Sequence, residues 1–268
     1  MLFRSLIERA RGQRSVTLTE AGALLARHAE AIVARLRAAQ ADYSAFTQGE
    51  AGVLRVGVYQ SVGTRILPMV LRDFALAWPR VEVRLTESAA DSDLLMHVER
   101  GDLDLTFTVL PVPPGPFEAV ELLTDPNLLL VNVSSPLSRL PQPLALRELQ
   151  DVPLIGPRSC LNGERLESRL RAYGIEPRVI FRSDDNGTVQ GLVGAGVGAA
   201  LMPRLAIDLT DLTTRTLELQ EGADPRVICL AWHRDRYRSA AARAFIDAAR
   251  VVCSELQAEV DAPAGVAA

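Results

Sequence analysis

The chain has 268 residues, of which 48% are apolar, and its formal net charge is -4 at pH 7. Such a composition is typical of a folded protein that is long enough for two hydrophobic cores. It excludes a disordered chain and a protein that is basic over a broad face, so any contact with nucleic acid must be local.

Three further features limit the class of protein. The cysteines Cys160, Cys229 and Cys253 form no C-x-x-C pair and no nearby histidine completes a metal site, so we expect neither metal nor cofactor. The first residues carry charges where a signal peptide would need an apolar run. Residues 186–203 carry no charge, but their five glycines favour a buried helix, turn and strand over a membrane span. We therefore expect a cytoplasmic protein that does not contact a membrane.

A hairpin and a long helix are predicted at the N-terminus. Residues 9–18 are rich in arginine around a glycine, as in a hairpin loop. Either Thr17, in a capping box with Glu20, or Thr19 can begin a helix that continues to about residue 47. A narrow apolar stripe along it has the heptad spacing of a coiled-coil dimer, which we prefer to packing on its own domain. The stripe consists of Leu25, Ala29, Ile32, Leu36, Ala39, Tyr43 and Phe46.

Strands and helices alternate after residue 52. The predicted elements are strand 53–59, helix 64–77, strand 81–86, helix 91–100, strands 103–109, 119–124, 127–133 and 152–156, helix 162–172, strand 177–182, helix 187–195, strands 197–202, 214–219 and 226–232, and helix 239–257. This alternation predicts mainly parallel sheets with helices on both faces. The expected fold class is α/β, with two Rossmann-like lobes, two extended crossings and a ligand cleft between the lobes.

Several stretches resemble LysR-type transcriptional regulators, in the order that this family has them. They are similar to the end of the winged helix-turn-helix and start of the linker helix, to the opening of the effector-binding domain, and to two later parts of that domain. The stretches are Leu6–Arg9 with Val16–Gly22, Leu54–Gly57 with Leu67–Pro68, Phe74 and Pro79, Gly101–Leu105, and Leu192–Pro203. The resemblance implies an effector-binding domain of the type 2 periplasmic-binding-protein fold.

The glycines in these stretches agree with that fold. Gly101 lies between a helix and a strand, where a left-handed helix cap is expected. Gly196 and Gly198 lie in a helix-to-strand turn. A dinucleotide-binding fingerprint has the opposite order, strand before helix, so we expect no Rossmann cofactor.

The resemblance also divides the chain. It implies a winged-helix remnant at 1–17, a linker and dimerisation helix at 18–50, an effector-binding domain at 51–258 and a disordered tail at 259–268. Lobe I would contain about 53–131 and 226–257, and lobe II about 132–225. The sequence resembles an N-terminally truncated regulator without the recognition helix, so we do not expect specific DNA reading by this chain alone. Four arginines in the wing remain for phosphate contacts, namely Arg4, Arg9, Arg11 and Arg14.

The implied effector site lies between the lobes. A loop after the first strand can hold a small polar or anionic organic effector through backbone N–H groups and hydroxyls, although Ser61 can instead cap the following helix. For Thr106 and Thr108, ordinary strand propensity is the alternative to a role in binding the effector. For Asp185 and Asn186 the alternative is helix capping, and for Cys160 it is a redox role. The expected residues are Tyr59, Gln60, Ser61, Val62, Gly63, Thr64, Thr106, Thr108, Arg158, Ser159, Cys160, Asp185, Asn186 and Thr188.

No catalytic constellation emerges from the sequence. The segment around Ser61 lacks the first glycine of a G-x-S-x-G elbow, and the histidines His28, His97 and His233 lie on separate elements. We therefore expect a regulator, not an enzyme, that acts on promoter DNA as a dimer or tetramer. The alternatives are a solute-binding protein of a transporter, and a truncated regulator that pairs with a full-length partner without reading DNA.

Overall fold

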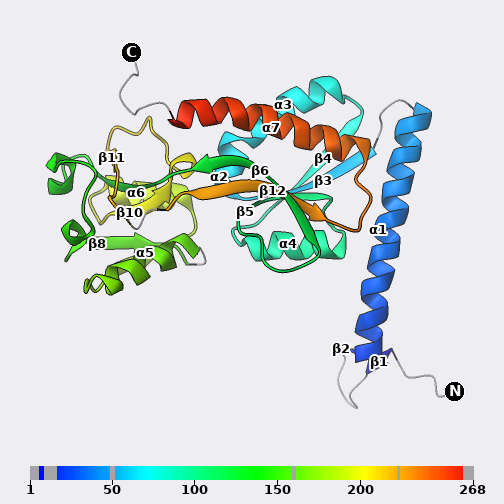
Figure 1. Cartoon of the computed structure of the whole chain (residues 1–268), viewed down its shortest axis with the longest axis horizontal. Coiled ribbons are helices and arrows are strands. Elements are labelled where there is room, and N and C mark those ends of the chain that lie inside the picture. The colour runs from blue at the N-terminus through cyan, green and yellow to red at the C-terminus, as the bar shows by residue number, and fades with distance from the viewer. Residues whose placement is uncertain (1–5, 9–16, 49–51, 159–160, 222–223, 262–268) are drawn as a thin grey trace.

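The computed structural model describes residues 6–8, 17–48, 52–158, 161–221 and 224–261. A long helix, α1 (Glu20–Gln48), stands at one side of two lobes, and two extended crossings connect these lobes (Figure 1). Among the described residues, no helix is long and apolar enough to cross a membrane. That part of the chain also contains no group of side chains suited to holding a metal ion.

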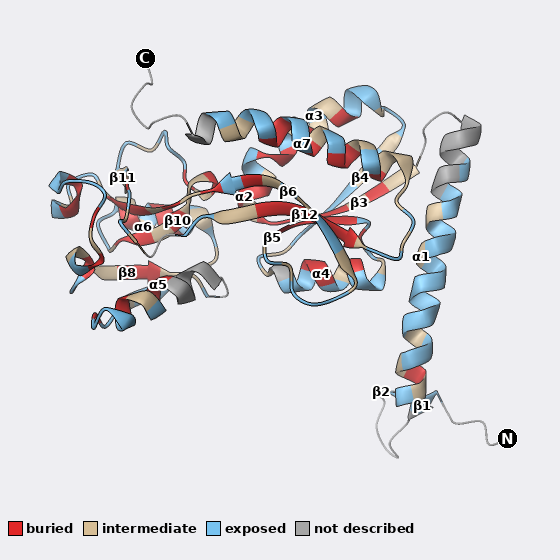
Figure 2. Ribbon diagram, in the orientation of Figure 1, coloured by how far each residue is buried: buried red, intermediate tan, exposed pale blue. Residues whose placement is uncertain are grey.

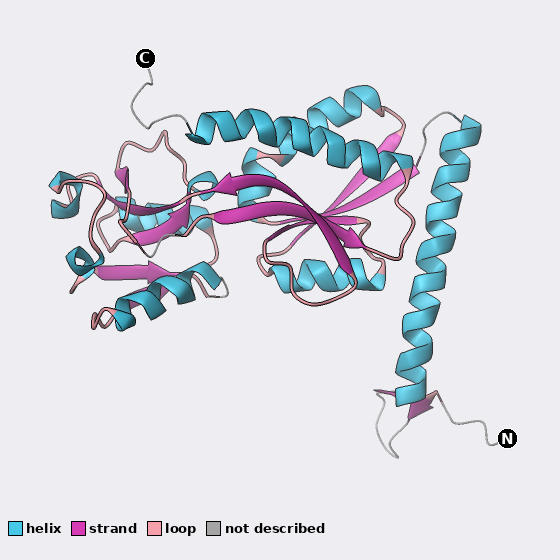
Figure 3. Ribbon diagram, in the orientation of Figure 1, coloured by secondary structure: helices cyan, strands magenta, loops and turns pink. Residues whose placement is uncertain are grey.

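Lobe I is built on a five-stranded sheet in the order β4-β3-β5-β12-β6. β3 is parallel to β4 and β5, whereas β12 is antiparallel to β5 and β6. Helices α2, α3 and α7 lie on one face of the sheet and α4 on the other (Figure 3). The elements are β3 (Gly52–Val58), α2 (Gln60–Arg65), α3 (Leu67–Ala77), β4 (Val81–Glu87), α4 (Asp91–Arg100), β5 (Leu105–Val109), β6 (Phe117–Asp125), β12 (Arg226–His233) and α7 (Ala240–Asp261).

The apolar runs explain which strands are central in lobe I. Val56 in β3, Phe107 in β5 and Leu230 in β12 are all fully buried, as expected for strands that are covered on both faces. Phe245 of α7 packs edge-on against Phe74 of α3 and against Phe107, so the two helices share one core with the sheet.

Lobe II contains two smaller sheets. One has the order β10-β7-β11 with antiparallel pairs, and the other pairs β8 with β9 in parallel. The elements are β7 (Asn127–Asn132), η1 (Pro136–Arg139), η2 (Leu146–Leu149), β8 (Pro153–Gly156), α5 (Leu161–Ala172), β9 (Arg178–Arg182), α6 (Asn186–Gly194), β10 (Ala200–Pro203), η3 (Arg204–Ala206) and β11 (Thr214–Leu217). The expected αβ alternation is present, but the crossing strands make both lobes mixed rather than mainly parallel.

The boundary between the lobes differs from the expected one. The expectation placed residues up to 131 in lobe I, yet β7 pairs with β10 and β11 of lobe II. The crossing therefore lies at Pro126, between the end of β6 and the start of β7. The sequence predicts both strands, but the lobe to which β7 belongs depends on its partners β10 and β11, which are distant in the chain.

Two helix boundaries also differ from those that the sequence predicts. The predicted helix 64–77 is two helices, since α2 begins at Gln60 and α3 begins at Leu67 with Pro68 in its first turn. Pro is favoured at that position because its missing N–H has no helical partner there. At the other end, α7 continues through Asp261, so the expected tail from residue 259 begins too early; residues 262–268 lie outside the described part.

The N-terminal hairpin and helix follow the expectation. β1 (Ile7–Glu8) pairs with β2 (Thr17–Leu18), and the hydroxyl of Thr19 accepts a hydrogen bond from Gly22 N at 3.0 Å, so Thr19 is the helix cap. Figure 2 shows that most of α1 is exposed. Of the heptad residues, Leu25, Ala29, Ile32, Leu36, Ala39 and Tyr43 are exposed, and the side chain of Phe46 lies outside the described part.

Candidate functional site

A cleft of about 380 Å³ opens between the two lobes. Its walls come from the start of α2 and the end of β4 in lobe I, and from the ends of β8 and β10 and the start of α6 in lobe II. The lining residues are Tyr59, Gln60, Ser61, Glu87, Ala89, Ile155, Pro157, Ser183, Asp184, Asp185, Asn186, Val189, Leu201, Met202, Pro203, Ala206 and Arg226. A concave site with apolar walls and a few polar groups is suited to a small molecule.

Gln60 connects the two walls of the cleft. Its side-chain Nε2 donates to Oδ2 of Asp185 at 2.9 Å, and its Oε1 accepts from the backbone N–H of Asn186 at 2.9 Å. Asp185 is also the N-cap of α6, because its Oδ1 accepts from the N–H of Thr188 at 2.7 Å. The N–H groups of Asn186 and Thr188 at the α6 N-terminus therefore already have acceptors within the protein.

A buried ion pair lies behind the cleft. Arg226 donates to Asp125 Oδ2 from Nε at 2.9 Å, and its Nη2 lies 2.7 Å from that oxygen. The same Nη2 donates to the hydroxyl of Ser61 at 2.8 Å, and the guanidinium lies 5.4 Å from the ring centre of Tyr59. The other oxygen of Asp125 accepts from Leu205 N. This pair fixes α2 to both crossings between the lobes.

Charge in the cleft is predominantly negative. Three carboxylates line it, Glu87, Asp184 and Asp185, whereas the charge of Arg226 is balanced by Asp125. Hydrogen bonds from Thr188 and from Gln60 hold the pKa of Asp185 below its ordinary value, so this group is ionised at neutral pH. Burial raises the pKa of Asp125, and the positive charge of Arg226 acts against that rise.

The structure brings together five of the expected effector residues. Tyr59, Gln60 and Ser61 line the cleft from lobe I, and Asp185 and Asn186 line it from lobe II. Their convergence agrees with the expectation that the first α2 turn faces the start of α6. The expected loop is helical from Gln60 onward, however, and this changes where its later residues lie.

The other expected residues that the structure describes do not line the cleft. Val62 is in the core of lobe I, and the Thr64 hydroxyl donates to Ser61 O; Gly63 lies beside them in α2. Thr106 and Thr108 are buried in β5, because this strand lies in the middle of the sheet and not at a free end. Arg158 donates its backbone N–H to Asp184, and Thr188 donates its own to Asp185. Ser159 and Cys160 lie outside the described residues.

The sequence reasoning missed Arg226, Glu87 and Asp184. Arg226 and Ser61 are 165 residues apart, and nothing near Arg226 in the sequence indicates a partner in α2. Glu87 is the last residue of β4, and Asp184 lies two residues after the end of β9, directly before Asp185. Attention to carboxyl ends of strands, which meet at a ligand cleft in α/β folds, would have found both.

Comparison with known proteins identifies the family. Residues 47–254 match the family described as the LysR substrate binding domain. The HTH-type transcriptional regulator YwbI of Bacillus subtilis is 28% identical over 199 residues, which are 73% of this chain and 65% of that protein. A probable hydrogen peroxide-inducible genes activator of Streptomyces viridosporus is 33% identical over 249 residues, which are 88% of this chain and 76% of that protein.

Solved structures agree with the family match. The C-terminal domain of a probable LysR family regulator from Rhodococcus sp. RHA1 superimposes with a TM-score of 0.67 at 27% identity, covering 74% of this chain and 98% of that one. HinK, a LysR family regulator from Pseudomonas aeruginosa, gives a TM-score of 0.70 at 24% identity, covering 90% and 82%. The chain thus belongs to the LysR family of transcriptional regulators, and its two lobes are the effector-binding domain of that family.

Proposed function

We propose that the interlobe cleft senses a small polar molecule, and that the resulting change in lobe closure alters how paired subunits hold promoter DNA. The observation that carries this proposal is the Gln60 bridge, because one side chain of lobe I bonds to both Asp185 and Asn186 of lobe II at the cleft. An effector that binds between these groups favours one separation of the lobes over another. A ligand shifts such an equilibrium only through its different affinity for the two states.

The charges of the cleft favour one class of effector. Glu87, Asp184 and Asp185 would repel a carboxylate or phosphate, whereas they would accept hydrogen bonds from hydroxyl or ammonium groups. Arg226 offers an anion little net charge, because Asp125 is ion-paired with it. We therefore propose a polar effector that carries donors, either neutral or cationic. An anionic effector, the other class expected from the sequence, is not favoured by these groups.

We also propose that subunits pair through α1. LysR regulators bind DNA and are oligomeric, and α1 exposes Ile32, Leu36 and Tyr43 at 61%, 59% and 71%. Burying such a stripe against a second α1 would stabilise a dimer. Promoter contact would come from the DNA-binding unit, of which the described residues contain the β1–β2 hairpin. The arginines expected to contact phosphates, Arg4, Arg9, Arg11 and Arg14, lie outside the described residues.

Thermal unfolding tests effector binding in the cleft. The full chain is screened against a panel of small amines, polyols, sugars and carboxylates, and each stabilising compound is retested on an Ala89→Trp variant. Ala89 lines the cleft and is exposed, so a Trp there fills the cleft without replacing a core residue. The matched control is Ala75→Trp, at an exposed position of α3 outside the cleft.

The proposal expects stabilisation of the wild type and of Ala75→Trp, and its loss in Ala89→Trp. Equal stabilisation of all three proteins would place the binding site elsewhere. A panel that stabilises none of them would count against a small polar effector of these classes.

A further inference from the structure

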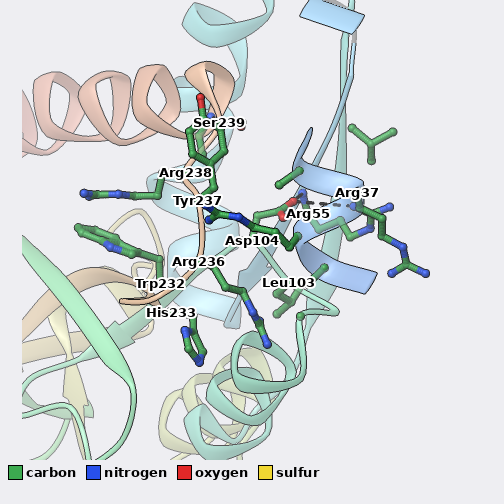
Figure 4. Close-up of a pocket in the computed structure, with 16 residues that line it drawn as sticks. Arg37, Arg55, Leu103, Asp104, Trp232, His233, Arg236, Tyr237, Arg238 and Ser239 are labelled. Atoms are coloured by element: carbon green, nitrogen blue, oxygen red, sulfur yellow. Dashed lines mark hydrogen bonds and ion pairs between the residues drawn. The ribbon is translucent and has the colours of Figure 1, made fainter. Parts of the chain in front are cut away.

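A second pocket lies between α1 and lobe I, away from the interlobe cleft. We call it the linker pocket; Figure 4 shows its side chains, and its volume is about 50 Å³. Among the residues that the structure describes, the linker pocket and the cleft share no lining residue. The linker pocket is lined by Ala34, Arg35, Arg37, Ala38, Val53, Arg55, Gly101, Leu103, Asp104, Trp232, His233, Arg236, Tyr237, Arg238, Ser239 and Ala242.

The described side chains that line the linker pocket have an excess of positive charge. Five arginines line it, from three separate parts of the chain, against one carboxylate, that of Asp104. Asp104 is already engaged, because its Oδ2 accepts from Arg55 N at 2.8 Å and lies 3.9 Å from Arg55 Nη1. Burial raises the pKa of Asp104, while the charges of Arg55, Arg236 and Arg37 act in the opposite direction. Among the described residues of the lining, a single carboxylate therefore faces several cations, while three carboxylates outside the lining, those of Asp102, Glu30 and Glu99, also act electrostatically on Arg236.

Contacts with carbonyl oxygens and aromatic rings hold three of these arginines in place. Arg236 donates to the carbonyl oxygens of Val98 and Glu99 at the C-terminus of α4. The Arg238 guanidinium lies 4.4 Å from the ring centre of Trp232, and that of Arg35 lies 5.7 Å from the ring centre of Tyr237. Carbonyl groups and ring faces orient a guanidinium but do not cancel its charge. Arg238 does approach one carboxylate, that of Glu118, but at 4.0 Å.

Guanidinium groups at one small cavity repel one another, and a bound anion removes that penalty. We propose that the linker pocket binds a small oxyanion of the phosphate or sulfate type. Its volume has room for a few water molecules or one such ion. Arginine forks match the oxygens of these ions well. The helix α7 begins at Ala240 beside the pocket, and the positive end of its dipole adds to the potential there.

An anion in the linker pocket would tie α1 to lobe I. Ala34, Arg35, Arg37 and Ala38 come from α1, whereas the facing arginines come from β3 and the segment after β12. The two parts already meet closely, since a Cβ at Gly101 would lie 2.7 Å from that of Ala34. Oxyanion binding therefore stiffens the junction through which lobe movement reaches the paired helices. This inference is independent of what occupies the interlobe cleft.

Calorimetric titration of the full chain with inorganic phosphate, at constant ionic strength maintained with sodium chloride, tests the proposal. The test variant is Arg37→Gln, at an exposed position of α1 that lines the pocket. The matched control is Arg27→Gln, the same change of charge at an exposed position of the same helix outside the pocket. An Ala89→Trp arm excludes binding in the cleft, and sulfate and glycerol phosphate replace phosphate to distinguish a free ion from the phosphate group of a metabolite.

We expect saturable phosphate binding by the wild type, Arg27→Gln and Ala89→Trp, and about tenfold weaker binding by Arg37→Gln, the effect of one charge-assisted hydrogen bond. Circular dichroism of each variant checks that it is folded. Absence of phosphate binding by the wild type would overturn the proposal. So would equal affinity of Arg37→Gln and Arg27→Gln, or loss of binding in Ala89→Trp.

Discussion

Gln60 of lobe I donates a hydrogen bond from Nε2 to Oδ2 of Asp185 in lobe II, at 2.9 Å. This contact joins the α2 N-terminus to the N-cap of α6 across the cleft. The lobes of this regulator are thus connected by a side chain that also lines the proposed effector site, and its replacement should alter both stability and lobe separation.

Replacing Gln60 by Ala should lower the free energy of unfolding by about 1 kcal/mol, because two partly exposed hydrogen bonds are lost. Urea unfolding measures this change. Gln150→Ala is the control, since Gln150 is exposed and lies away from the cleft. If both variants unfold at the same urea concentration, the Gln60 bridge does not stabilise this arrangement of the lobes.

Replacing Arg226 by Met should be far more harmful. It leaves the fully buried carboxyl of Asp125 without its cation, which costs about 3 to 5 kcal/mol. The double variant Asp125→Leu with Arg226→Met removes both charges and should recover much of the loss. Chemical unfolding of the wild type, both single variants and the double variant gives the coupling energy. An additive cycle would show that the pair does not act as a unit.

The stability of the Arg226→Met variant should depend on pH in a defined direction. Without Arg226, burial remains the largest influence on Asp125 and raises its pKa above the unfolded value of 3.8, while the hydrogen bond from Leu205 N and the charge of Arg204 act in the opposite direction. A raised pKa in the folded state gives stability that is present below the unfolded pKa and lost as pH rises through the folded pKa. The deficit of Arg226→Met relative to wild type should therefore shrink as the pH falls from 7 toward 4. A deficit that stays constant over this range would contradict the assignment.

Much of the fold can be predicted from the sequence, but only part of the residues that line the cleft can. The α4 helix begins and ends where its periodicity predicts, and Gly101 has the expected left-handed conformation, at a φ of 88°. These features depend on local chemistry. Arg226 and the position of β7 depend instead on partners that are distant in the chain, and the threonines of β5 were misplaced because local patterns do not tell which strand is central.

The exposed stripe of α1 predicts a specific effect on assembly. Replacing Ile32 and Leu36 together by Glu should convert the chain to a monomer, because a charged pair in a coiled-coil seam is strongly unfavourable. Light scattering measures the mass. Arg27→Glu together with His28→Glu is the control, since these exposed positions of α1 are outside the heptad stripe. An unchanged mass for the Ile32 and Leu36 variant would exclude this stripe as the interface.

Of the three cysteines, we expect Cys229 and Cys253 to be unreactive toward thiol reagents in the folded protein. Cys229 and Cys253 are buried, and burial raises the pKa of Cys253 to about 12, so its reactive thiolate is scarce at pH 8. Brief treatment of the native protein with iodoacetamide, followed by mass spectrometry, should modify neither. Rapid modification of Cys253 would show that α7 opens readily. Modification of Cys160 would leave this prediction intact and direct attention to a redox role for that residue.

Small-angle X-ray scattering of the full chain, with and without a saturating compound from the stabilisation screen, tests effector sensing most directly. Binding in the cleft between Gln60 and Asp185 should decrease the radius of gyration of the wild type, because the lobes close on the ligand. The Ala75→Trp control should behave in the same way, and Ala89→Trp should show neither binding nor closure. A compound that binds wild type and Ala89→Trp with equal affinity, or that binds the wild type without any change in its scattering curve, would contradict this function of the cleft.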